Sequence, residues 1–305
     1  KMCRSADGLL EGFRPGVMER LGLGPAECLA ANSKLVFGRM TGWGQDGPLS
    51  QTAGHDINYV AISGVLGMLG RADERPLPPL NIVGDMGGGG LLLAFGMVCA
   101  LLESRSSGQG QVVDTSMVEG SALMASAVYG LRPAGWWSDQ RGSNLLDGGA
   151  PFYEVYETLD GGYMAVGAIE PQFYSALLKG LGLDESDLPH QMKKQCWPEL
   201  KEKFTRVFKT RTRDEWAAVF DGTDACASPV LSLEEAARHP HNTARASFTR
   251  PHDVLQAAPA PRFSRTAPEM SLPPPGPGQH SDAILAEFGF DDSEIAALRG
   301  SKAVS

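Results

Sequence analysis

Two side chains thirty positions apart, His55 and Asp85, are of the types that carry protons in enzymes. His55 stands directly before a stretch with the apolar spacing of a helix. Histidine is the side chain best suited to act as a general base near neutral pH. A histidine at this place also fits a residue that only fills the loop or caps the helix, so its type alone decides nothing.

Asp85 is followed by Met86 and then by four consecutive glycines, Gly87 to Gly90. A carboxylate directly before a helix is favoured for capping and for the helix dipole alone. Four glycines exceed what a cap needs. They would let a ligand approach the backbone, so that free N–H groups at the helix start face an oxygen with developing negative charge.

A second carboxylate, Glu170, ends a run of alternating apolar residues and precedes Pro171. It fits a loop carboxylate or the first-turn acid of the next helix equally well. Its functional interpretation is as the group that orients a histidine and fixes its tautomer.

Strand and helix patterns alternate over the first 130 residues, which is typical of a parallel, doubly wound α/β sheet. The strands are expected at 8–11, 34–40 and 111–114, and the helices at 18–21, 26–32, 57–68, 91–105 and 116–129.

The pattern changes after residue 130. Residues 152–170 predict a β-hairpin around Asp160-Gly161-Gly162, and helices are expected at 172–181, 197–209 and 214–220. The predicted organisation is a large domain of residues 1–130 and 260–305, a linker at 131–150, a small α+β domain at 151–245 and a linker at 246–259.

Composition excludes several classes of protein. The net charge of −9 comes without a basic stripe, so no nucleic-acid partner is expected. The five cysteines are scattered and no metal-ligand spacing occurs, which indicates reduced thiols in an intracellular protein and no metal site. The longest apolar run, residues 91–102, is shorter than the roughly 20 residues of a membrane span, so no membrane partner is expected.

The sequence motifs around these residues resemble those of a known family. AGHDINYVAISG, PLNIVGDMGGGG, GQGQVVDTSMVEGS, LLDGGAPFYEVYET and GYMAVGAIEPQFY resemble the alpha-methylacyl-CoA racemases of the class III CoA-transferase superfamily over nearly the whole chain. The resemblance implies that His55 and Asp85 are the catalytic bases and that Glu170 hydrogen-bonds the histidine. It also implies substrate contacts, with Arg14 expected near the CoA phosphates; the set is Arg14, Gly54, Asp56, Ile57, Asn58, Tyr59, Gly87 and Gly88.

The family implies racemisation of 2-methylacyl-CoA thioesters by two-base proton transfer through an enolate, as in fatty acid metabolism and bile acid synthesis. For this, Asp85 must be protonated when His55 is the base, and a partly desolvated site favours that state. No cofactor is expected, because CoA is part of the substrate. The family forms interlocked homodimers, and the sequence leaves open whether Glu170 acts within one chain or across the dimer. The location would be peroxisomal or mitochondrial in a eukaryote and cytoplasmic in a bacterium.

Two other functions stay open. A class III CoA-transferase would use an aspartate to attack the thioester, although those enzymes lack the GHDINY histidine. The family also begins with two strand-and-loop units, roughly 70 residues by the size of a βαβ unit, that this sequence does not contain. A truncated, non-catalytic form that acts only as an interaction partner is therefore the second alternative.

Overall fold

The computed structural model describes residues 1–270 and 272–304. The chain divides into two compact units, Met2–Val230 and Leu231–Ser305 together with Lys1. The first unit contains both sheets that the sequence predicts, so the mixed α/β fold class is confirmed.

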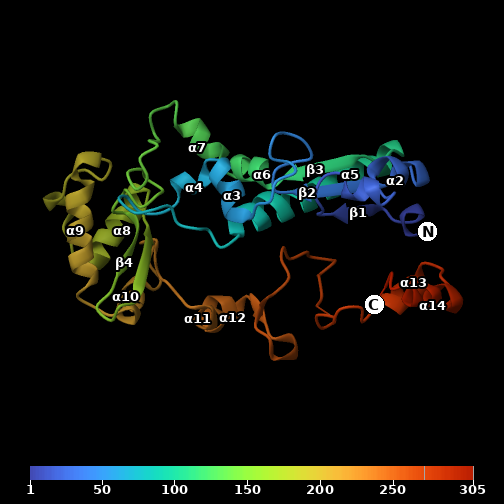
Figure 1. Cartoon of the computed structure of the whole chain (residues 1–305). Helices are drawn as coiled ribbons and strands as arrows, with labels where there is room; N and C mark the ends of the chain where they lie inside the picture. Colours follow the sequence, from blue (N-terminus) through green and yellow to red (C-terminus); the bar gives the residue numbers. More distant parts are fainter. Residues whose placement is uncertain (271, 305) are drawn as a thin grey trace. The chain divides into compact units, whose positions relative to one another are not determined.

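A three-stranded parallel sheet lies in the first part of Met2–Val230 (Figure 1). Its order is β1 (Gly8–Glu11), β2 (Val36–Thr41) and β3 (Val112–Ser116), with every pair parallel. Neighbouring side chains of a strand point to opposite faces. Thus Val36 packs with one cluster of buried residues and Phe37 with another.

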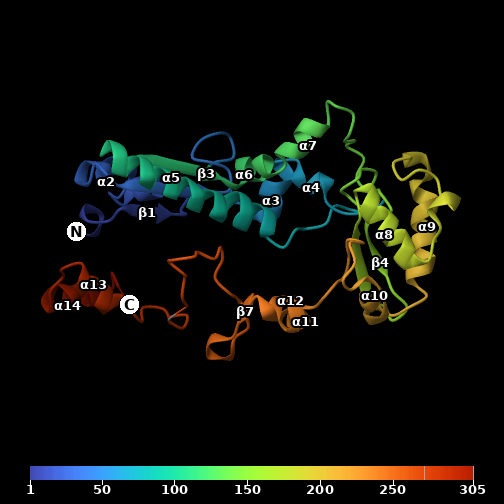
Figure 2. The ribbon, with the colours of Figure 1, turned by 180° about the vertical axis from the view of Figure 1, so that it is seen from behind.

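Helices cover both faces of this sheet. Phe37 packs with Met18 of α1 (Val17–Arg20) and Cys28 of α2 (Pro25–Ala31). Val36 packs with Leu93, Met97 and Ala100 of α5 (Leu92–Ser107), which runs along the strands when seen from behind (Figure 2). The short helix η1 (Met2–Arg4) precedes β1. The doubly wound arrangement is thereby confirmed.

The segment before α5 differs from the predicted connection. It forms a π-helix, η2 (Ile82–Leu91), so Asp85 lies at a helix N-terminus as expected, but as the fourth residue within the first turn and not as a cap before it. A π-helix is rare and occurs frequently at functional sites. It packs against α3 (Asp56–Ile62) and α6 (Met117–Met124), and the neighbouring short helices are α4 (Val65–Met68) and α7 (Ser126–Leu131).

Together η2 and α5 make one helical stretch, Ile82–Ser107, of 26 residues. It is long and apolar enough to cross a membrane, so the argument from the length of residues 91–102 is wrong. Length and composition are weak grounds for a span, because helices that pack on a sheet meet the same criterion. One face of this stretch does pack on the sheet, through Leu93 and Met97.

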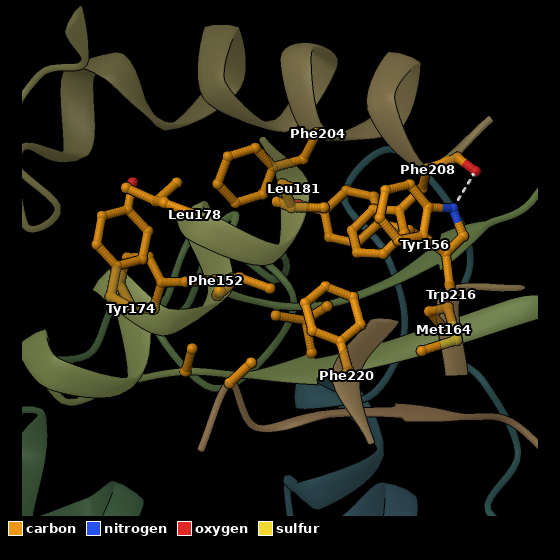
Figure 3. Packing of buried hydrophobic residues seen from close by; sticks show 14 of the residues in the cluster. Phe152, Tyr156, Met164, Tyr174, Leu178, Leu181, Phe204, Phe208, Trp216 and Phe220 are labelled. Atoms are coloured by element: carbon orange, nitrogen blue, oxygen red, sulfur yellow. Dashed lines mark hydrogen bonds between the residues drawn. The ribbon is translucent and has the colours of Figure 1, made fainter. Parts of the chain in front are cut away.

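The second part of Met2–Val230 is built around an antiparallel sheet of β4 (Tyr153–Glu157), β5 (Tyr163–Gly167) and β6 (Ala227–Pro229). It carries α8 (Pro171–Leu181), α9 (Trp197–Phe208) and α10 (Arg213–Phe220), with η3 (Glu185–Asp187) and η4 (Lys194–Cys196) between them. Figure 3 shows their shared core, where the indole of Trp216 donates a hydrogen bond to the carbonyl of Phe208. The predicted hairpin and three helices are all present.

In the unit Leu231–Ser305, the residues that the structure describes form only short elements. They are α11 (Leu233–Arg238), α12 (Pro240–Ala244), β7 (Phe248–Thr249), η5 (Pro251–Asp253), β8 (Gln256–Ala257), α13 (Ser281–Glu287) and α14 (Asp292–Gly300). The assignment of residues 260–305 to the large domain stays a prediction.

Candidate active site

His55 is the N-cap residue, directly before α3. It adopts an extended backbone at the N-cap, and its backbone N–H donates to Oδ1 of Asn58 at 3.1 Å. This bond satisfies a backbone donor at the helix end. The imidazole is exposed, so the helix fixes its attachment point while its ring stays accessible.

The loop before His55 is held by Tyr59, one turn into α3. Its hydroxyl donates to the carbonyl of Gly54, and its ring meets Trp43 edge-on at 4.8 Å between centroids. A Cβ at Gly42 would lie 2.0 Å from this ring, so only glycine fits there. The loop from Gly42 to Gly54 is thus folded onto the helix that follows His55.

Asp85 projects from η2 and is half-buried. Its Oδ2 accepts a hydrogen bond of 2.6 Å from the side-chain amide of Asn81. Asn81 has φ +61°, a left-handed conformation that asparagine tolerates better than most residues. Within the described part of the chain Oδ1 accepts no hydrogen bond, which leaves it available to exchange a proton.

Asp56 connects the two candidate bases. It follows His55 in the chain, and its Oδ1 accepts the backbone N–H groups of Gly84 and Asp85, each at 2.8 Å. Tyr59 of α3 and Asp85 of η2 also interact electrostatically. Burial raises the pKa of Tyr59, the carboxylate of Asp85 raises it further, and Arg14 opposes the shift.

A cavity of about 320 Å³ opens beside His55. Arg14, Trp43 and Tyr59 also line it, so an exposed guanidinium and an imidazole face one space. The buried Glu11 fixes the backbone of the loop that carries Arg14, because its Oε2 accepts the backbone N–H of Phe13 at 2.7 Å. Arg39 pairs with the other Glu11 oxygen at 2.7 Å.

The predicted substrate contacts fall into different environments. Ile57 and Asn58 are exposed, whereas Asp56 is buried with its carboxylate engaged, so any contact with substrate would use its backbone. Gly87 lines an apolar groove, and Gly88 is buried against α6. The contacts themselves stay predictions.

Within the run of four glycines, Gly88 has a packing role. A Cβ at Gly88 would lie 2.6 Å from the backbone nitrogen of Ser121, and one at Gly120 would lie 1.9 Å from the carbonyl oxygen of Gly88. The two helices therefore touch backbone to backbone. The N–H groups of Gly84 and Asp85 are not free for a ligand, contrary to expectation, because Asp56 accepts both.

Glu170 lies elsewhere in the chain. It precedes α8, is exposed, and lines a cavity of about 580 Å³ with Tyr174, Glu185 and His190. Within the described residues no hydrogen bond joins Glu170 to His55. A single chain thus bonds the Asp85 backbone to Asp56, the neighbour of His55. Among the described residues, Asp85 does not line the His55 cavity, and Glu170 lines a different cavity.

Two residues that position the site, Asn81 and Gly120, were not predicted from the sequence. Asn81 had a usable signal, since asparagine suits a left-handed turn four residues before the acid it contacts. The role of Gly120 had none, because it depends on the helix that crosses it. Within the described residues, no group of three or more His, Cys, Asp or Glu side chains is arranged to hold a metal ion.

Known proteins resemble this chain throughout. The family described as CoA-transferase family III matches residues 1–281. The chain is 53% identical to alpha-methylacyl-CoA racemase of Mus musculus and 48% identical to that of Homo sapiens, in each case over 100% of the chain and 80% of the relative. A solved CAIB/BAIF family protein from Brucella suis has a TM-score of 0.79 at 22% identity, over 94% of this chain and 76% of that one, which shows the fold.

Proposed function

The chain belongs to CoA-transferase family III, and on that premise we propose that it racemises 2-methylacyl-CoA thioesters. The racemases of mouse and human supply the activity and the substrate class. The observation that supports the proposal most is the pair of hydrogen bonds from the Asp85 segment to Asp56, the neighbour of His55.

The reaction needs a base on each face of the α-carbon. His55 takes the α-proton, the electron pair of the broken C–H bond moves into an enolate, and the protonated Asp85 returns a proton to the opposite face. In the reverse direction Asp85 is the base and the imidazolium of His55 the acid. Arg14, which lines the His55 cavity, is suited to the CoA phosphates. The scheme needs no cofactor, since CoA is part of the substrate.

A homodimer is part of the proposal. Met86, Leu91, Phe95, Val98 and Leu102 are each more than 60% exposed along η2 and α5. A continuous apolar face of this kind marks a protein interface. In a dimer, Glu170 of one chain could approach His55 of the other and fix its tautomer. The intracellular location stays a prediction.

The test follows the α-hydrogen in deuterated water. A pure enantiomer of a 2-methylacyl-CoA should lose its optical purity and gain deuterium at the α-carbon, without any carboxylate acceptor. His55→Ala and Asp85→Asn should each lower racemisation about 10²- to 10⁴-fold, as expected for loss of a general acid–base group. His241→Ala and Asp187→Asn, which change exposed residues, are the matched controls.

Two results would overturn the proposal. One is full racemisation by either site variant. The other is thioester exchange that requires an added carboxylate and leaves the α-hydrogen in place, because that is the behaviour of a CoA-transferase acting through an acyl-enzyme anhydride.

A further inference from the structure

Asp56 is a buried carboxylate with an unusual task. Asp56 is 2% exposed and is the first residue of α3. Its Oδ1 nevertheless accepts hydrogen bonds from a different helix, η2. The donors are the consecutive backbone N–H groups of Gly84 and Asp85. The first N–H groups of a helix have no partner within it, so Asp56 satisfies two of those of η2 from outside.

The fit between Asp56 and η2 is tight. A Cβ added at Gly84 would lie 2.4 Å from Oδ1 of Asp56 and 3.1 Å from Val60. The carboxylate therefore lies directly on the backbone that carries Asp85. No room is left for a water molecule in between.

Asp85 is consequently held at two points. Asp56 holds its backbone nitrogen, and Asn81 holds its Oδ2. The first of these points belongs to the residue adjacent to His55. Any shift of η2 away from α3 would have to break both Asp56 bonds, so the same carboxylate links the supports of both bases.

We propose that Asp56 is a positioning residue, whose carboxylate sets the separation of His55 and Asp85 by locking η2 onto the start of α3. This rests on the proposed function, since the separation matters only if both groups act on one carbon. Asp56 itself does not touch the reacting atoms. Its loss displaces Asp85, and a displacement of about 1 Å costs on the order of 100-fold in rate.

The test compares three substitutions at position 56. Asp56→Ala removes the acceptor, and Asp56→Ser is polar but too short to reach both N–H groups. Asp56→Asn retains an Oδ1 that accepts both bonds. We expect kcat for racemisation to fall about 100-fold in the Ala and Ser variants with little change in KM, and the Asn variant to recover most of the activity.

Isotope exchange of each enantiomer separates positioning from general damage. Asp85→Asn provides the reference, since it should still exchange the α-hydrogen of the enantiomer that His55 deprotonates, without inverting it. The Ala and Ser variants should show the same one-sided pattern. Amide hydrogen exchange of residues 82–91 should also become faster in both variants. The Ser variant provides this measurement if the Ala variant folds poorly.

The outcomes are distinct. If the unsubstituted chain moves no α-hydrogen from either enantiomer, the proposed function fails and the positioning role fails with it. If the unsubstituted chain racemises but the Ser variant loses exchange of both enantiomers equally, or loses none, only the positioning role of Asp56 is overturned.

Discussion

The parallel-sheet region (residues 2–131) and the hairpin region (residues 145–230) bury their apolar side chains very differently. The hairpin region has one cluster of sixteen buried residues, with Tyr156, Phe208 and Trp216 in ring contact at its centre. The parallel-sheet region has three clusters of no more than four buried residues each. The hairpin region therefore has one large core, whereas the region that carries His55 and Asp85 has several small ones.

The difference teaches how the site is held. A large core fixes its residues through packing, whereas the site rests on individual contacts: Asp56 with the η2 backbone, Gly88 against Gly120, and Arg39 with Glu11. Each such contact depends on one or two residues. Single substitutions should thus affect the two regions in different ways.

The largest expected effect is in the hairpin core. Phe208→Ala should lower the free energy of unfolding of the hairpin region by about 3 to 5 kcal/mol, because it leaves a cavity among packed rings. Leu21→Ala, at an exposed side chain of the parallel-sheet region, should change it by no more than about 0.5 kcal/mol. Amide hydrogen exchange of residues 145–230 measures both. Equal losses would mean that the two regions share one core.

The contact between η2 and α6 should respond almost as strongly. Gly120→Ala places a methyl group on the Gly88 carbonyl and should cost about 3 kcal/mol through overpacking. Activity should fall as well, because η2 carries Asp85. Gly130→Ala in α7, where a Cβ meets nothing within 4 Å, is the control. Denaturant unfolding and a racemisation assay compare the two variants. A Gly120→Ala variant with unchanged stability would contradict the close crossing of η2 and α6.

Alkaline pH should weaken the hairpin region selectively. Burial, and then Glu185, raise the pKa of Tyr174 to about 12. In the unfolded chain tyrosine ionises near pH 10, so stability that is present below about pH 10 is lost as the pH rises toward 12, by about 2 to 3 kcal/mol. Urea unfolding at pH 9 and pH 11.5 should show this loss, and Tyr174→Phe should reduce it. The exposed Tyr153→Phe should not.

The smallest effects test hydrogen bonding inside the same core. The hydroxyl of Tyr156 donates to the carbonyl of Pro151, whereas the hydroxyl of Tyr174 has no partner in the described residues. At neutral pH, Tyr156→Phe should lower stability by about 1 kcal/mol, and Tyr174→Phe should raise it by about 1 kcal/mol. Thermal unfolding of both variants gives the signs, and identical signs would contradict the assignment of partners.

Much of this fold could be predicted from local patterns. The strand at Val36–Thr41 is apolar and bounded by turn residues, and the helix after His55 has apolar residues at helical spacing. The candidate bases could be chosen because histidine and aspartate are among the few side-chain types that transfer protons in enzymes. Their meeting could be expected only from the resemblance of the surrounding motifs.

The remainder depended on contacts between distant segments. The π-helix could not be predicted, because its wide turns are stabilised by Asp56 and Gly120, which lie 28 residues or more from Gly84 and Gly88. The packing role of the glycines could not be predicted for the same reason, because a sequence shows a run without side chains but not which segment packs against it. The full length of the helical stretch Ile82–Ser107 could not be predicted, because glycine-rich stretches rarely continue a helix.

The wide turns of η2 also make its length critical. An ordinary α-helix advances about 100° per residue, so removing one glycine between Gly87 and Gly90 would let the segment rewind as an α-helix and would turn Asp85 by about that angle relative to α5. The sheet and α5 could stay as they are while the acid faced a new direction. In this stretch, the number of residues matters as much as their identity.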